Sequence, residues 1–328
     1  MFKRFKKFLF TALAVMCTAI LFAGCGGGDS NNATTSEKFI HIATGNVAGT
    51  YYPIGGGLSE ILNQKIEKMH AGVQATSGSV SNIQLLKDGT VELAIIQNDI
   101  AYYAVKGEEM FKDQNKYQFE NLRALSALYP EICQIMTLDS SGIKSVSELK
   151  GKKVAVGAKG SGAEANARQI LEIYGLSYDD IDAQYLSFSA ASKAIEAGTI
   201  DAAFLTAGCP TIAVQAVAAQ KKIRILPLDD EHIKALTEKY PFYTETIIPK
   251  NTYTDFDEDV KTVSVMALLV CNENVSDDLG YQITKTIFEN LDTLKTSHPA
   301  ISQLEKSKAT EGMTIDLNKG ADKFFKEK

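Results

Sequence analysis

Hydrophobic positions in the first third of the chain alternate between two spacings, one typical of buried strands and the other of amphipathic helices. After Pro53, a residue that suits the first turn of a helix, large apolar residues return repeatedly to one helical face. Strands and helices that alternate at this spacing predict a parallel sheet covered by helices. The elements predicted here are strands at 39–44, 73–77 and 93–97 and helices at 53–62 and 81–87.

The same alternation begins again near residue 153. A shared phrase, Gly-Thr-Val-Glu-Leu-Ala at 89–94 and Gly-Thr-Ile-Asp-Ala-Ala at 198–203, occupies the corresponding place in each series. We therefore predict two α/β lobes of similar plan; the alternative is a chance similarity between two helix-to-strand turns. The second series consists of strands at 153–157, 183–186 and 202–206 and helices at 163–174 and 190–197.

Two longer apolar segments, residues 132–138 and 263–271, bracket the second series. We expect them to be strands that cross between the lobes. The acid-rich segment 276–294 is predicted to be an amphipathic helix that returns to the first lobe. The predicted division is residues 39–130 and 262–328 for lobe one, and residues 131–261, with the crossover segments, for lobe two.

The N-terminus has the pattern of a secretory signal. Four cations precede the uncharged stretch 8–22, which is too short to span a bilayer comfortably. Cys25 follows small residues and resembles the acylated cysteine of bacterial lipoproteins, although Phe22 stands where Leu or Val is usual. We predict a signal peptide at 1–24, lipidation of Cys25 that anchors the protein to a membrane, and a flexible tether at 25–38. The alternative is a cleaved signal followed by an incidental cysteine.

Composition limits the classes of function. Of 328 residues, 45% are apolar and 23% are charged, which is an ordinary globular balance that excludes disorder and a multi-span membrane protein. The net charge is −6, and removal of the four signal-peptide cations lowers it to −10. Because no basic excess is available to neutralise phosphates, nucleic acid is not an expected partner.

The residues that carry most enzyme chemistry are scattered. Cys133, Cys209 and Cys271 lie in separate apolar runs, and no close Cys or His pair has the spacing of a metal site. Ser161 has Lys159 and Ala163 where the nucleophile elbow of hydrolases requires glycine, and no phosphate-binding P-loop occurs. We predict no catalytic residue, no metal and no cofactor.

Small polar residues instead follow the predicted strands at their carboxyl ends, where open α/β sheets bind ligands. The segment 161–164 (Ser-Gly-Ala-Glu) opens a helix, so its free N–H groups and the helix dipole favour a carboxylate there. The same four residues also fit a helix capping box. In the other lobe, the segment 44–52 follows a strand in the same way, and Tyr51 and Tyr52 are candidates for either a cleft wall or the core. Asp99 or Glu164 is a candidate for receiving a ligand ammonium group.

Six short segments stand out along the mature chain: TGNVAGTYYPIG at 44–55, GSVSN at 78–82, AIIQND at 94–99, LKGKKVAVG at 149–157, GSGAE at 160–164 and DAAF at 201–204. In this order they resemble the TAXI-type extracytoplasmic solute receptors of TRAP transporters, over nearly the whole mature chain. Asn46 stands where a second glycine is usual in that family, and Ala163 stands where threonine is common.

The resemblance implies a two-lobed periplasmic-binding-protein-like α/β fold, in which each lobe is a mainly parallel sheet flanked by helices and crossover strands join the lobes. It also implies an extracytoplasmic receptor that delivers a small carboxylate, such as glutamate, glutamine or a dicarboxylate, to a TRAP membrane permease. The residues expected to bind this ligand are Thr44, Gly49, Tyr51, Tyr52, Ser79, Gln97, Ser161, Gly162, Ala163, Glu164 and Ala207.

Three other functions compete with this interpretation. An ABC-type receptor of the same fold differs in its membrane partner, and a ligand sensor coupled to a membrane kinase differs in the same way. An exported enzyme on this scaffold would be recognised by turnover of the bound ligand.

Overall fold

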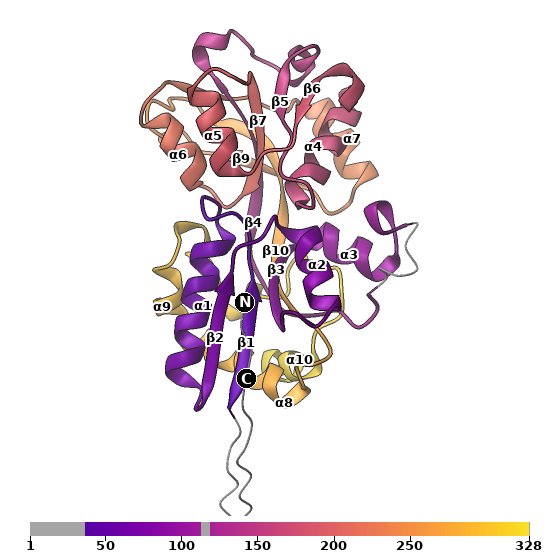
Figure 1. Ribbon diagram of the computed structural model, residues 1–328, viewed down its shortest axis with the longest axis vertical. Coiled ribbons are helices and arrows are strands. Elements are labelled where there is room, and N and C mark those ends of the chain that lie inside the picture. Colours follow the sequence, from indigo (N-terminus) through magenta and orange to yellow (C-terminus); the bar gives the residue numbers. More distant parts are fainter. Residues whose placement is uncertain (1–36, 113–118, 328) are drawn as a thin grey trace, which may run out of the picture. The chain divides into compact units, whose positions relative to one another are not determined.

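The computed structural model describes residues 37–112 and 119–327, which belong to one compact unit. The predicted signal peptide, Cys25 and most of the tether lie outside these residues. Within the described part, two groups of helices and strands form two lobes, one below the other in Figure 1.

Lobe one is a parallel sheet in which β1 lies between β2 and β3. Helix α1 covers one face together with α8 and α9, and helices α2 and α3 cover the other face. Its elements are β1 (Lys38–Ala43), α1 (Tyr51–Lys65), β2 (Met69–Gln74), α2 (Ser79–Lys87), β3 (Leu93–Gln97), α3 (Asn98–Lys106), α8 (Asp277–Glu289), α9 (Leu291–Lys295) and α10 (Lys319–Lys326).

Lobe two repeats this arrangement with β5 between β6 and β7, again in parallel. Helices α4 and α7 pack on one face of its sheet, and α5 and α6 pack on the other. Its elements are β5 (Lys153–Ala155), α4 (Gly162–Ile173), β6 (Asp182–Gln184), α5 (Phe188–Glu196), β7 (Ala202–Ala207), α6 (Ile212–Ala218), β8 (Ile223–Ile225), α7 (Asp230–Lys239) and β9 (Thr244–Ile248).

Two long antiparallel strands, β4 (Arg123–Leu138) and β10 (Val260–Cys271), run through both lobes (Figure 1). Strand β10 pairs with β3 in lobe one, and β4 pairs with β7 in lobe two. The ten strands of the described residues therefore form one mixed sheet in the order β2-β1-β3-β10-β4-β7-β5-β6, with β8 on β4 and β9 on β10. Short 3-10 helices lie at Glu109–Phe111, Asp139–Ser141, Val146–Leu149, Tyr178–Asp180, Pro299–Ile301 and Lys306–Lys308.

The two crossover strands are where we expected them, but β4 begins nine residues earlier than its predicted start at Ile132. The strand predicted at 73–77 ends at Gln74, and its side chains alternate in burial from Met69 onward. Helix α3 was not predicted; its buried face includes Ile100 and Tyr103. The predicted lobe boundaries stay predictions, because both long strands belong to each lobe.

The repeated phrase occupies equivalent turns in the two lobes. Gly89 precedes β3 with a φ of +67°, and Gly198 precedes β7 with a φ of +68°. Glycine adopts this left-handed conformation without the steric cost that a Cβ atom brings. Each turn therefore ends a helix and starts the strand that pairs with a crossover strand.

The segment 276–294 forms two helices rather than one, because the chain leaves helical geometry at Asn290, with φ −126° and ψ 30°.

Cys133, Cys209 and Cys271 are free thiols. Among residues 37–112 and 119–327, no cluster of His, Cys, Asp and Glu could hold a metal ion. No helix in the same residues has the length and apolarity that crossing a membrane requires.

Candidate functional site

A cavity of about 130 Å³ lies between the two lobes. It is placed at the carboxyl ends of the parallel strands, which is where an open α/β sheet collects ligand-binding groups. Its lining residues are Gly45, Asn46, Gly49, Thr50, Tyr51, Thr76, Ser77, Gly78, Ser79, Gln97, Tyr129, Glu131, Ala158, Ser161, Gly162, Ala163, Ser187, Phe188, Thr206 and Ala207.

Five helices begin at this cavity. The residues that precede the first turns of α1, α2, α3, α4 and α5 all line it: Thr50, Gly78, Gln97, Ser161 and Ser187. The first N–H groups of a helix have no partner within the helix, and its N-terminus carries a partial positive charge. Five such ends directed at one space form a site suited to an anion.

Helix α4 shows how the sequence prepares one of these ends. Ser161 accepts a hydrogen bond from the N–H of Glu164 at 3.1 Å and donates its own hydroxyl to the carbonyl of Ala158 at 2.7 Å. Among the described residues, the N–H groups of Gly162 and Ala163 donate to no partner. They are the donors that α4 offers to a ligand.

Two polar groups of the cavity are buried without a partner. The side-chain oxygen Oε1 of Gln97 and the hydroxyl of Tyr129 have no hydrogen bond among the described residues, although these side chains are about 1% and 2% exposed. A buried polar atom without a partner costs about 1–3 kcal/mol. Both groups line the cavity, so a bound ligand that satisfies them would recover this cost.

Among the described residues that line the cavity, Glu131 is the one acidic residue, and none is Lys, Arg or His. Its carboxylate accepts a hydrogen bond from the hydroxyl of Tyr51, which lies 3.5 Å from the hydroxyl of Ser79. Burial raises the pKa of Glu131 to about 8, against the opposing effect of the Tyr51 bond. At neutral pH this side chain is therefore mostly protonated.

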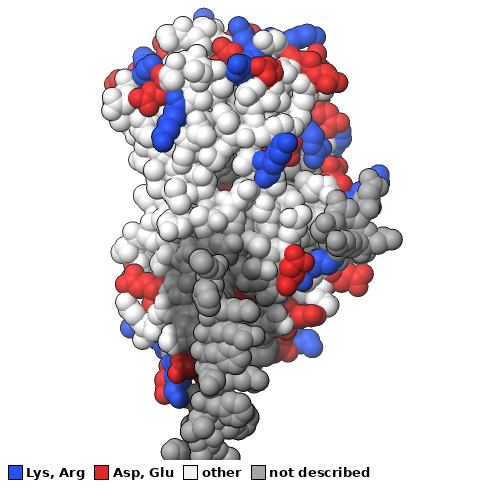
Figure 2. Space-filling view, viewed as in Figure 1, with Lys and Arg blue, Asp and Glu red and all other residues white. Residues whose placement is uncertain are grey.

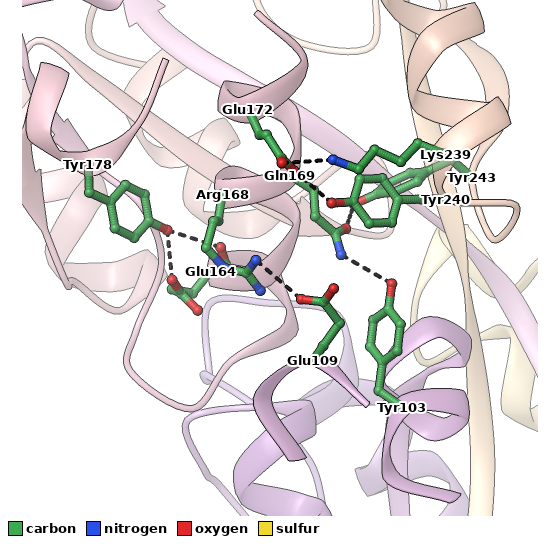
Figure 3. A network of polar contacts seen from close by, with 10 residues as sticks. All are labelled: Tyr103, Glu109, Glu164, Arg168, Gln169, Glu172, Tyr178, Lys239, Tyr240 and Tyr243. Carbon is green, nitrogen blue, oxygen red and sulfur yellow. Dashed lines mark hydrogen bonds and ion pairs between the residues drawn. The ribbon is translucent and has the colours of Figure 1, made fainter. Parts of the chain in front are cut away.

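Polar contacts beside the cavity join the lobes through α3 and α4 (Figure 3). Gln169 of α4 donates to the hydroxyl of Tyr103 at 3.2 Å and accepts from that of Tyr243 at 2.6 Å. Arg168 lies 3.3 Å from the carboxylate of Glu109. These contacts tie α4 of lobe two to α3 of lobe one and to the 3-10 helix Glu109–Phe111 that follows it.

Asn166 is at the centre of the buried part of this interface. Its amide donates to Asp99 at 3.1 Å and to Tyr243 at 2.8 Å, and its oxygen accepts from Gln97 at 3.0 Å. Gln97, from the floor of the cavity, is thus held by the opposite lobe. Burial raises the pKa of Asp99 to about 7, although hydrogen bonds from Ile100 and Asn166 oppose the shift.

Eight of the residues expected to contact a ligand line the cavity. Lobe one contributes Gly49, Tyr51, Ser79 and Gln97, and lobe two contributes Ser161, Gly162, Ala163 and Ala207. The structure brings together segments that are more than 150 residues apart in the chain. Their contact with a ligand stays a prediction.

Three expected residues lie elsewhere. The hydroxyl of Thr44 donates to the carbonyl of Gln74 at 2.8 Å, which ties β1 to its neighbour β2 instead of facing the cavity. Tyr52 is 39% exposed on the other side of α1, and the Glu164 carboxylate accepts from Tyr178 at 2.7 Å. None of the three lines the cavity, and Asp99 does not line it either.

Sequence reasoning missed Glu131, Tyr129 and Phe188. The first two lie on β4, in the part of this strand that precedes the predicted crossover segment. A single carboxylate inside a sixteen-residue, mostly buried strand was the signal that could have identified Glu131. Phe188 is the first residue of α5, just as Tyr51 is the first residue of α1. This position at a helix start is the one signal that could have identified Phe188.

Charges of both signs are mixed on the face of the molecule drawn in Figure 2, while its middle, where the lobes meet, is mostly uncharged. We therefore expect the groups that recognise a ligand to lie inside the cleft.

Solved structures with the same fold include a protein of Bordetella bronchiseptica RB50 and a putative L-cystine ABC transporter from Listeria monocytogenes. The first has 16% identity and a TM-score of 0.52 over 84% of this chain and 76% of its own. The second has 13% identity and a TM-score of 0.50 over 81% of this chain and 97% of its own. The prediction of a periplasmic-binding-protein-like α/β fold is confirmed.

The periplasmic aliphatic sulphonate binding protein SsuA from Escherichia coli is similar at 16% identity and a TM-score of 0.46, covering 81% of this chain and 78% of its own. The sequence itself matches the model of one protein family, and the match covers residues 42–328, which include both lobes and the whole cavity. The chain belongs to the NMT1-like family.

Proposed function

We propose that the protein is an extracytoplasmic solute-binding protein that holds a small carboxylate in the cavity between its lobes and has no catalytic activity of its own. The observation that carries this proposal is the convergence of five helix N-termini on one cavity between the lobes. The N–H groups of Gly162 and Ala163 would bind the carboxylate, and the unpartnered groups of Gln97 and Tyr129 would orient the rest of the ligand.

Enclosure by both lobes strengthens these interactions. The N–H of Ser81 donates to the carbonyl of Gly160 at 3.0 Å, and the N–H of Ala213 donates to that of Ala48 at 3.1 Å. These contacts close the cleft on opposite sides of the cavity. Hydrogen bonds to a carboxylate are stronger where water is excluded and the local dielectric is low.

Two kinds of membrane partner are candidates. The sequence segments that resemble TAXI receptors favour a TRAP permease, and a similar structure named as an ABC transporter favours an ABC-type partner. The comparisons favour the ABC-type partner, and we adopt it as the first candidate, with the TRAP permease as the second. In either case we propose that Cys25 carries a lipid anchor at the outer side of a bacterial membrane.

The test is isothermal titration of the purified protein with amino acids, 2-oxo acids, dicarboxylates and alkanesulfonates, followed by mass spectrometry of the released compound. A carboxylate that binds and is recovered unchanged supports the proposal. A compound recovered as a product would make the protein an enzyme, and binding by sulfonates alone would contradict the carboxylate.

Uptake of the same ligand would then distinguish the two membrane partners. The uptake is measured in membrane vesicles to which the purified protein is added. Uptake that requires ATP supports an ABC-type partner. Uptake that requires an ion gradient and persists without ATP supports a TRAP permease.

A further inference from the structure

The following inference rests on the proposed function and concerns the choice among carboxylates. We propose that Glu131 is the specificity-determining residue of the cavity: it releases its proton to solvent and pairs as a carboxylate with the ammonium group of an α-amino acid. The corresponding 2-oxo acid has no such group. The cavity therefore selects amino acids over their 2-oxo analogues.

The position of Glu131 suits this role. It lies on β4, is about 2% exposed and lines the cavity. The hydroxyl of Tyr51 donates to one of its oxygens, and no cation pairs with it among the residues that the structure describes. A buried carboxylate is stable only when it is paired or hydrogen-bonded. The bond from Tyr51 and the side-chain contact of Gln97 orient the group, and neither brings a positive charge, so its charge is left to be balanced from the cavity side.

The charges around the cavity favour a zwitterion, a ligand that carries one negative and one positive group. The five helix ends supply partial positive charge for a carboxylate, and the lining supplies no formal cation. An α-amino acid also brings a positive ammonium group, for which Glu131 is the only acidic side chain of the lining. A site with these two poles accommodates both ends of the zwitterion.

The surroundings of Glu131 keep its proton in place until a cation arrives. The titratable groups that face it are Tyr51 on α1, Tyr129 and Cys133 on β4 and Asp99 on α3, and none of them is a cation. Burial raises the pKa of Glu131 to about 8, and the negative charge of Asp99 contributes to the rise. A ligand ammonium reverses this balance, whereas a 2-oxo acid leaves the proton on Glu131.

The test measures protons released on binding. The protein is titrated at pH 7 in two buffers of different ionisation enthalpy with three pairs of probes: L-glutamate and 2-oxoglutarate, L-alanine and pyruvate, and L-leucine and 4-methyl-2-oxopentanoate. In any pair that binds, the amino acid should release about one proton more than the 2-oxo acid and bind at least about tenfold more tightly.

Two variants locate the effect. Glu131→Gln keeps an oxygen that accepts from Tyr51 but has no proton to lose. It should abolish the difference in proton release within each pair, weaken amino-acid binding at least about 30-fold and change 2-oxo-acid binding by less than about threefold. Asp99→Asn is the matched control, because Asp99 is also a buried carboxyl with a raised pKa but does not line the cavity. It should keep a difference within each pair, reduced only by the share of the rise in the pKa of Glu131 that the charge of Asp99 contributes.

The outcomes separate this inference from the function on which it rests. Equal proton release within a pair by the wild-type protein, or an unchanged amino-acid preference in a folded Glu131→Gln variant, would overturn the role of Glu131. Circular dichroism and thermal unfolding establish that the variant is folded. Failure of all six probes and of the wider panel of amino acids, 2-oxo acids and dicarboxylates to bind would contradict the proposed function itself, and the role of Glu131 would fall with it.

Discussion

The two lobes follow the same plan but present different chemical groups to the cavity. Lobe one and the adjoining part of β4 contribute, besides small residues, the large polar side chains of the lining, namely Tyr51, Gln97, Tyr129 and Glu131. Lobe two contributes mainly small residues and backbone at the start of α4, together with Phe188. One side can therefore distinguish ligands by their functional groups, and the other can approach closely and supply N–H donors.

Glycine residues make this close approach feasible on the lobe-two side. Gly157, in the loop between β5 and α4, has a φ of +99°, and a Cβ atom there would lie 2.9 Å from the N–H nitrogen of Glu164. Gly160 has a φ of +80°, and its Cβ would lie 2.6 Å from the hydroxyl of Ser81 in the opposite lobe. The loop folds tightly over the helix start because neither position carries a side chain. The corresponding loop in lobe one instead carries Asn46, whose amide oxygen accepts from Ser189 at 2.9 Å.

The largest effect is expected for Gly162→Ala, which adds a side chain where lobe two presents only backbone to the cavity. A Cβ atom at Gly162 would lie 1.6 Å from Oε1 of Gln97, and Gln97 is buried and hydrogen-bonded to Asn166. The side chain of Gln97 must move and break that bond before the lobes can meet. We expect the variant to bind the ligand found for the wild type about 100-fold more weakly, the equivalent of about 2.7 kcal/mol, as measured by isothermal titration.

Gly56→Ala is the matched control within lobe one. Nothing lies within 4 Å of a Cβ atom built there, and the residue is in the middle of α1. Alanine should stabilise this helix by about 0.5–1 kcal/mol and leave affinity unchanged. If Gly162→Ala binds as tightly as the wild type, the backbone of lobe two does not need its close approach.

The second prediction concerns the pH dependence of stability. Burial raises the pKa of Asp99 from 3.8 to about 7, so the folded protein holds this proton more tightly than the unfolded chain does. The stabilisation is fully present below about pH 4 and is lost as the pH rises to about 7. Over that interval, the free energy of unfolding should fall by up to about 1.4 kcal/mol per pH unit on account of this one group.

Urea denaturation at a series of pH values measures this slope. Asp99→Asn should remove its share of the slope while Glu131, whose pKa is raised to about 8, keeps its own contribution. The loss of a hydrogen bond to Asn166 will also change the absolute stability, so the slope is the quantity to compare. An unaltered slope would mean that Asp99 does not hold its proton in the folded protein.

The order of elements and the location of the site were predictable because they depend on local patterns. The strand at 93–97 has its predicted bounds, and the glycine loop before Ser161 indicated a helix start with free N–H groups. These signals lie within a few neighbouring residues. They identify the end of the sheet where the cavity lies.

The individual contacts were less predictable because they depend on residues far apart in the chain. The orientation of the Glu131 side chain depends on a hydrogen bond from Tyr51, which lies 80 residues earlier and on a different element. Thr44 and Glu164 were expected at the ligand but lie outside the lining for the same reason, since Gln74 and Tyr178 hold their side chains elsewhere. Sequence patterns indicate which loops surround the cavity but not which side chains point into it.

The smallest effect is expected at the rim of the interface between the lobes. Arg168 and Glu109 form an ion pair at 3.3 Å across it, but their side chains are 38% and 33% exposed (Figure 3). Water and salt screen such a pair, and side-chain ordering offsets part of its attraction, so exposed pairs contribute about 0.2–1 kcal/mol. Arg168→Ala, Glu109→Ala and the double variant should each bind ligand within about fivefold of the wild type. A coupling energy above about 2 kcal/mol in this double-mutant cycle would show that the rim, rather than the buried contacts of Asn166, holds the lobes together.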